Sequence, residues 1–100
     1  MDTGLKGKTV VITGASRNMG SLAAVAFARE GANLAICARA KIAELEQVAE
    51  EARASGVKVI ARACDVSDHA DVARFVAEAR EAVGGIDVAI NLAEIGRAHV

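Results

Sequence analysis

The chain has 100 residues, of which 53% are hydrophobic and 25% are charged, and its formal net charge is −1. This length allows one small domain, and the composition is typical of a globular chain and excludes a disordered one. The near-neutral charge and the scarcity of aromatic residues (Phe27 and Phe75 alone) argue against nucleic-acid or anionic-membrane partners, which would require a basic surface or stacking platforms.

Apolar strands and amphipathic helices alternate along the chain. Strands are expected at residues 9–13, 33–38, 58–63 and 86–91. Helices are expected at residues 19–30, at 41–54, and from the N-cap Ser67 to the pair Gly84-Gly85. The buried face of the second helix is predicted to consist of Ile42, Leu45, Val48, Ala49 and Ala52. The buried face of the third is predicted to consist of Val72, Phe75, Val76, Ala79 and Val83.

Short strands of almost purely apolar residues are typical of a parallel sheet that is buried on both faces. Right-handed crossover connections then predict an α/β fold, a Rossmann-type doubly wound parallel sheet with strand order 3-2-1-4. Ligands of such sheets bind at the carboxyl ends of the strands. The candidate binding residues of this chain all follow or end an expected strand.

The first expected strand leads into a loop of small residues, and a helix with no charge in its first turns follows. A glycine turn between a strand and a helix lets backbone N–H groups and the positive end of the helix dipole meet a phosphate. The candidate phosphate loop consists of Gly14, Ala15, Ser16, Arg17, Asn18, Met19 and Gly20. The alternative is an ordinary turn that binds nothing.

This loop resembles the cofactor loop of the short-chain dehydrogenase/reductase family, Thr-Gly-x-x-x-Gly-x-Gly. Thr13, Gly14 and Gly20 match the pattern, and Asn18 replaces its middle glycine. Asn tolerates a positive φ better than most residues do, although its side chain would narrow the space for a pyrophosphate. The resemblance spans residues 6–93 and implies a nicotinamide cofactor.

The second expected strand ends in Ala38-Arg39. Sites for NAD(H) usually carry an acidic residue here, which binds the ribose 2′-hydroxyl, whereas an arginine can bind a 2′-phosphate through charge-assisted hydrogen bonds. Within the resembled family, basic residues at the positions of Arg17 and Arg39 accompany NADP(H). The two arginines together therefore favour NADP(H) over NAD(H) as the cofactor, and the alternative is that either arginine is a solvated surface residue.

Two further segments resemble family motifs, at the ends of the third and fourth strands. Asp65 and Val66 resemble the pair that contacts the adenine ring, although Asp65 could also help to cap the following helix. Asn91, Leu92 and Ala93 resemble Asn-Asn-Ala, with Leu92 replacing the second Asn near the nicotinamide ribose. Asn91 could equally be structural, and in the resembled family that is largely its role.

The last seven residues, 94–100, look foreign to the rest of the chain. They can be encoded as GAG ATC GGA AGA GCA CAC GTC, which is how a widely used sequencing adapter reads in this frame. The native part is thus expected to be residues 1–93, the N-terminal part of a dinucleotide-binding domain, and residues 94–100 an adapter-derived tail. The other interpretation is a natural loop after the fourth strand.

The resemblance implies hydride transfer between NADP(H) and an alcohol or carbonyl substrate, in a parent protein that forms a homo-oligomer. The family's Ser and Tyr-x-x-x-Lys lie further along the chain, and this sequence contains no Tyr. No catalytic residue is therefore expected here, and the fragment is predicted to be inactive and poorly soluble. The alternatives are a non-catalytic NADP-binding regulator and, on a related fold, a methyltransferase; a P-loop nucleotidase is excluded because Gly-Lys-Ser/Thr is absent.

The two cysteines, Cys37 and Cys64, fall at expected strand ends and are predicted to be buried thiols, with a redox pair as the alternative. They fit a reducing cytoplasm. Neither a signal peptide nor a membrane span is expected, because the N-terminus is short and polar and no apolar run is long enough. His69 is expected to be solvated, and no metal site is predicted.

Overall fold

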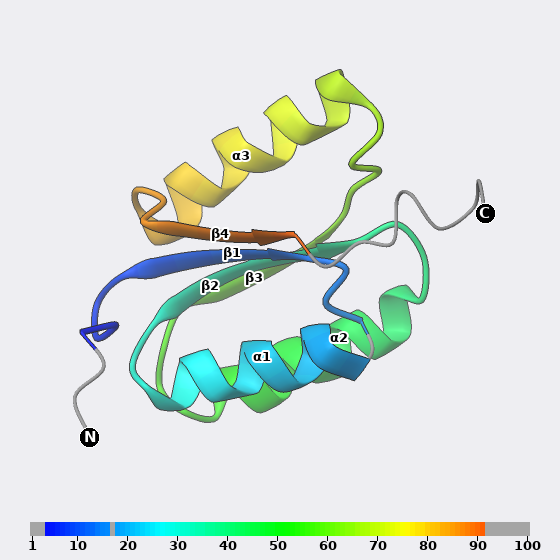
Figure 1. The fold of residues 1–100 in the computed structure, drawn as a ribbon. Coiled ribbons are helices and arrows are strands. Elements are labelled where there is room, and N and C mark those ends of the chain that lie inside the picture. The colour runs from blue at the N-terminus through cyan, green and yellow to red at the C-terminus, as the bar shows by residue number, and fades with distance from the viewer. Residues whose placement is uncertain (1–3, 17, 92–100) are drawn as a thin grey trace.

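The computed structural model describes residues 4–16 and 18–91, which form one parallel sheet with helices on both faces (Figure 1). The described elements are, in chain order, β1 (Thr9–Thr13), α1 (Asn18–Arg29), β2 (Asn33–Ala38), α2 (Ile42–Arg53), β3 (Val59–Ala63), α3 (His69–Val83) and β4 (Val88–Asn91). The predicted strand and helix pattern is confirmed throughout, with differences of a few residues at the element ends.

The sheet has the order β3-β2-β1-β4, and every described strand pair is parallel. This confirms the predicted doubly wound α/β topology. At β1 the chain changes direction across the sheet: the first two crossovers lead outward to β3, and the next returns to the other side of β1. A doubly wound sheet binds its ligand at such a switch point, beyond the carboxyl ends of the strands.

Helices α1 and α2 cover one face of the sheet and α3 lies over the other (Figure 1). Alternate residues of β1 enter different cores, because successive side chains of a strand point to opposite faces. Val10 and Ile12 pack in the core beneath α1 and α2, and Val11 packs in the core beneath α3. The apolar character of β1 and β2 thus reflects burial on both faces, as predicted.

The outer strands of the described sheet are less buried than their sequences indicate. Arg62 and Ala63 of β3 are exposed, and β4 alternates half-buried and exposed residues. β4 also begins two residues later than predicted. Asp87 explains the delay, because its N–H donates to the Thr9 carbonyl (3.0 Å) and its carboxylate accepts from the Thr9 N–H (2.9 Å).

The prediction that Ser67 is the N-cap of the third helix is wrong. The N-cap is Asp68, whose side chain accepts from the backbone N–H groups of Ala70 (3.0 Å) and Asp71 (3.3 Å). Ser67 instead donates its hydroxyl to Oδ1 of Asp65 at 2.7 Å. Serine and aspartate both cap helices well, so the sequence alone could not show which of the two residues is the N-cap. The hydrogen bond to Asp65 leaves the Ser67 hydroxyl outside the capping role.

The predicted buried face of α2 is correct for Leu45, Val48, Ala49 and Ala52, but Ile42 is 39% exposed. Ile42 is the first residue of the helix and follows Lys41, whose φ of 62° places it in the left-handed region. Helical periodicity assigns a residue to a face, yet it does not say how far the opposing layer extends.

Candidate functional site

The candidate phosphate loop turns sharply at the end of β1. Gly14 has a φ of 71°, a conformation that glycine adopts without a steric penalty. The next residue, Ala15, is fully buried, and its N–H donates to the carbonyl of Cys37 in β2 (3.1 Å). The loop therefore starts at a fixed point between β1 and β2. Arg17 lies outside the described residues, and of Asn18 only the backbone, which begins α1, is described.

Gly20 holds the loop against the first turn of α1. A Cβ atom at this position would overlap the carbonyl oxygen of Gly14 and lie 2.8 Å from the Cα of Ala15. The helix can approach the loop this closely because Gly20 has no side chain. The first turn of α1 contains no acidic residue, so the positive end of its dipole is not neutralised there by a carboxylate.

The end of β2 brings Arg39 to the same edge of the sheet. Ala38 is buried and its carbonyl accepts from the N–H of Cys64, while Arg39 is exposed. Hydrogen bonds from Ser67 hold the pKa of Asp65 below its ordinary value, and the charge of Arg39 contributes to the same shift. Arg39 and Asp65 are therefore close enough to interact electrostatically.

Asp65 shapes the connection between β3 and α3. Its Oδ1 accepts from the hydroxyl of Ser67 (2.7 Å) and from the Ser67 N–H (3.0 Å), and its carbonyl accepts from the N–H of Asp68 (3.0 Å). Asp65 thus stabilises the turn before the helix, whereas the N-cap itself is Asp68. Val66 is partly buried and packs against the core beneath α3.

Asn91 ends β4 directly beside the start of the phosphate loop. It pairs in register with Thr13, and its Oδ1 accepts from the Thr13 hydroxyl at 2.7 Å. The bond ties the carboxyl ends of β1 and β4 together, in agreement with the structural role considered for Asn91. Leu92 and Ala93 lie outside the described residues.

Because the strands are parallel and adjacent, the predicted site residues that are described meet at one edge of the sheet. They are Gly14, Ala15, Ser16, Met19, Gly20, Ala38, Arg39, Asp65, Val66 and Asn91. This edge can offer backbone donors, a helix N-terminus, a cation and a carboxylate to one elongated anionic molecule.

Two thiols lie directly beneath this edge. Cys37 and Cys64 are free and buried, as predicted. Burial, and after it the neighbouring Cys64, partly through a hydrogen bond between the two side chains, raises the pKa of Cys37 to about 12. A thiol with a raised pKa is a poor nucleophile at neutral pH, which agrees with a packing role.

The roles of Asp71 and Arg74 of α3 were not predicted from the sequence. Asp71 lies in the first turn of α3, where a negative charge favours the helix dipole, and its Oδ2 also accepts from the backbone N–H of Asp65 (2.7 Å). Arg74 binds Asp71 (2.6 Å) and the carbonyl of Ala63 (3.0 Å). The spacing of Asp71 and Arg74 predicts a surface ion pair on one helix, but the reach to the β3–α3 loop could not be derived from it.

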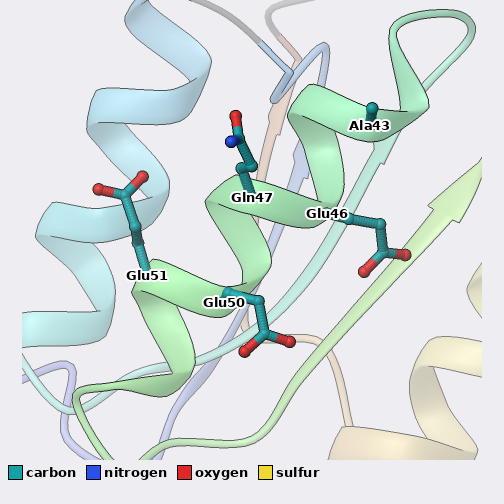
Figure 2. Close-up of a pocket in the computed structure, with 5 residues that line it drawn as sticks. All are labelled: Ala43, Glu46, Gln47, Glu50 and Glu51. Atoms are coloured by element: carbon teal, nitrogen blue, oxygen red, sulfur yellow. The ribbon is translucent and has the colours of Figure 1, made fainter.

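A shallow hollow on the outer surface of α2 does not coincide with this edge. Figure 2 shows its lining side chains projecting from α2; they are Ala43, Glu46, Gln47, Glu50 and Glu51. Its carboxylates would repel a phosphorylated ligand. Among residues 4–16 and 18–91, no group of three or more His, Cys, Asp or Glu residues could hold a metal ion, and no helix is long and apolar enough to cross a bilayer.

Comparison with known proteins gives a consistent result. A family model described as short chain dehydrogenase matches residues 8–100. The chain is 42% identical over 93 residues to oxidoreductase UcpA of Salmonella typhimurium, covering 93% of this chain and 35% of the relative. It is 41% identical over 93 residues to ketoacyl reductase HetN of Nostoc sp., covering 93% and 32%.

Solved structures agree with these relatives. A short-chain type dehydrogenase/reductase from Mycobacterium marinum superimposes with a TM-score of 0.79 at 38% identity, covering 85% of this chain and 34% of the other. An NAD⁺-bound xylitol dehydrogenase superimposes with a TM-score of 0.80 at 29% identity, covering 85% and 32%. The chain thus spans about a third of the length of these relatives and neighbours.

Proposed function

The chain belongs to the short-chain dehydrogenase family, and from that premise we propose that it is the cofactor-binding part of a longer oxidoreductase. This parent protein would transfer hydride between NADP(H) and an alcohol or carbonyl substrate. The observation that carries the proposal is the meeting of a glycine loop, a helix N-terminus, Arg39 and Asp65 at one edge of the parallel sheet.

The residues at this edge fit a dinucleotide. Because there is no room for a Cβ at Gly20, the loop packs directly against the N-terminus of α1. This helix N-terminus would favour a pyrophosphate bound by the loop. Asp65 and Val66 would receive the adenine ring, and Asn91, Leu92 and Ala93 would lie toward the nicotinamide ribose. The nicotinamide supplies or accepts the hydride when the cofactor is bound.

The preference for NADP(H) over NAD(H) rests on Arg39. It is exposed, and it follows Ala38 at the position where NAD(H) sites usually place an acidic residue. It makes no ion pair with any residue of the described part of the chain, so its guanidinium is available to a 2′-phosphate. Arg17 would add a second cation on sequence grounds.

Arg39→Asp in the parent protein tests this preference. Reversing the charge should weaken NADPH binding at least about tenfold and leave NADH binding unchanged or tighter, because only NADPH carries the 2′-phosphate. Both affinities are measured by isothermal titration calorimetry. Arg80→Asp, an exposed charge reversal on α3, is the matched control and should change neither affinity. An equal loss for both cofactors in Arg39→Asp contradicts the preference.

The proton-transfer groups are proposed to lie outside residues 1–93. The sequence contains no Tyr, so this chain cannot supply a tyrosine acid or base to the reaction. Its own residues would bind and orient the cofactor, and the family's Ser, Tyr and Lys would complete the site in the parent. We place the parent in the cytoplasm, where the free thiols Cys37 and Cys64 would stay reduced, and expect it to form a homo-oligomer.

A further inference from the structure

Two side chains of α3, those of Asp71 and Arg74, form hydrogen bonds to the backbone around Asp65. Asp71 accepts from the N–H of Asp65 through Oδ2 (2.7 Å) and from Arg74 through Oδ1 (2.6 Å to Nη2 and 3.1 Å to Nε). Arg74 also donates from Nη2 to the carbonyl of Ala63 at 3.0 Å. We call this pair the Asp71–Arg74 clamp, since it holds the backbone on both sides of Cys64.

The clamp fixes a segment that is also held from the sheet. Cys64, between the two clamped residues, is buried, and its N–H donates to the Ala38 carbonyl at 3.0 Å. The backbone from Ala63 to Asp65 is therefore restrained by β2 on one side and by α3 on the other. The Cα of Asp65, from which its side chain extends, is therefore held in a fixed position.

The carboxylate of Asp65 is restrained as well. Both hydrogen bonds from Ser67 end on Oδ1, which sets the plane of the carboxylate. Oδ2 makes no hydrogen bond within the described part of the chain. An acceptor of this kind, charged and fixed in direction, suits an amino group on a planar ring.

The clamp is not needed to cap the helix. Asp68 already accepts from the N–H groups of Ala70 and Asp71, which are the donors that an N-cap satisfies. The Asp71 carboxylate points back to the Asp65 N–H, outside the helix, and hydrogen bonds from Asp65 and then Arg74 lower its pKa. Asp71 is therefore charged at neutral pH while it holds the loop.

We propose that the Asp71–Arg74 clamp is a positioning pair that gives the parent protein its preference for a purine base with a 6-amino group. Asp71 and Arg74 would not touch the cofactor; they would hold Asp65 where its free oxygen meets the amino group of adenine. The inference rests on the proposed function, in which Asp65 receives the adenine ring.

The test compares reduced NADPH with its reduced hypoxanthine analogue, in which a carbonyl replaces the 6-amino group, on the full-length parent protein. Loss of a hydrogen bond to a charged acceptor predicts that the native protein prefers NADPH on the order of tenfold. Asp71→Ala should bring this ratio close to one. Asp71→Asn should keep a ratio above that of Asp71→Ala, because its amide oxygen can still accept from the Asp65 N–H.

Glu78→Gln is the matched control, since Glu78 pairs with Arg74 and Arg62 and, within the described part of the chain, makes no hydrogen bond to residues 63–66. It should keep the native ratio. Arg74→Met provides the same test as Asp71→Ala if the latter does not fold, and it should also lower the ratio.

A native ratio that survives in both Asp71→Ala and Arg74→Met overturns the inference, as does an equal fall in Glu78→Gln. A native protein that binds NADPH and the analogue equally well also overturns it, while leaving the proposed function standing. Failure of the native protein to bind either dinucleotide would instead overturn the proposed function itself, together with the inference built on it.

Discussion

At Gly20, the absence of a side chain determines how the phosphate loop meets α1. A Cβ would overlap the Gly14 carbonyl oxygen, and backbone atoms cannot move aside as a flexible side chain can. Gly20→Ala should therefore destabilise the protein by about 1–3 kcal/mol, the usual cost of overpacking. Urea unfolding of the parent protein measures the loss.

Gly85→Ala is the control for that substitution. No atom of the described residues would lie within 4 Å of a Cβ at Gly85, so the free energy of unfolding of Gly85→Ala should differ from the native value by less than about 0.5 kcal/mol. If Gly20→Ala lowered the free energy of unfolding no more than Gly85→Ala does, the loop would not need this close approach to α1.

Cys37 gives the protein a specific dependence on alkaline pH. Its thiol pKa rises from 9.0 in the unfolded chain to about 12 in the fold, first because of burial and then because of Cys64. The fold therefore favours the neutral thiol, and this contribution to stability is complete below pH 9 and is lost as the pH rises toward 12.

The expected loss is on the order of a few kcal/mol over that window, relative to Cys37→Ala. Measuring the free energy of unfolding of both proteins against pH checks it. The substitution also leaves a small void, but that cost does not depend on pH and only offsets the two curves. Parallel curves between pH 9 and 12 would show that the fold tolerates the thiolate.

At the scale of elements, the start of α3 offers two candidate N-caps, Ser67 and Asp68, which substitution can distinguish. Asp68→Ala should cost about 1 kcal/mol, because it removes the acceptor of the Ala70 and Asp71 N–H groups. Ser67→Ala removes an exposed hydroxyl bond to Asp65 and should cost less. The stability of the two variants is measured by thermal unfolding. A larger loss of stability in Ser67→Ala than in Asp68→Ala would show that Ser67 is the N-cap.

Local patterns predicted most elements well. Apolar runs located β1 and β2 to the residue, since both strands are buried on two faces. The ends were predicted less well where a side chain bonds to distant backbone. Asp87 delays β4 by bonding to Thr9, and Asp65 takes the hydroxyl of Ser67. Such bonds depend on which segments meet in space, so sequence spacing does not contain them.

At the scale of the whole molecule, the crossover rule and the strand order common in Rossmann-type sheets together predicted the sheet order and the edge where the candidate site residues gather. The reach of Asp71 to the Asp65 N–H was not predictable, because it depends on how α3 lies over β3. Exposure of Met19 and Leu22, each 69% exposed, was not predictable either. The low solubility expected of the isolated chain stays a prediction.

The central claim is that the carboxyl edge of this sheet binds NADP(H), and hydrogen–deuterium exchange of the parent protein with and without NADPH tests it most directly. We predict that NADPH slows exchange in peptides that cover residues 14–20, 38–39 and 64–66, and leaves residues 43–51 of the acidic hollow on α2 unchanged. The claim would be contradicted if saturating NADPH slowed exchange at none of the three edge segments, or slowed it only in residues 43–51.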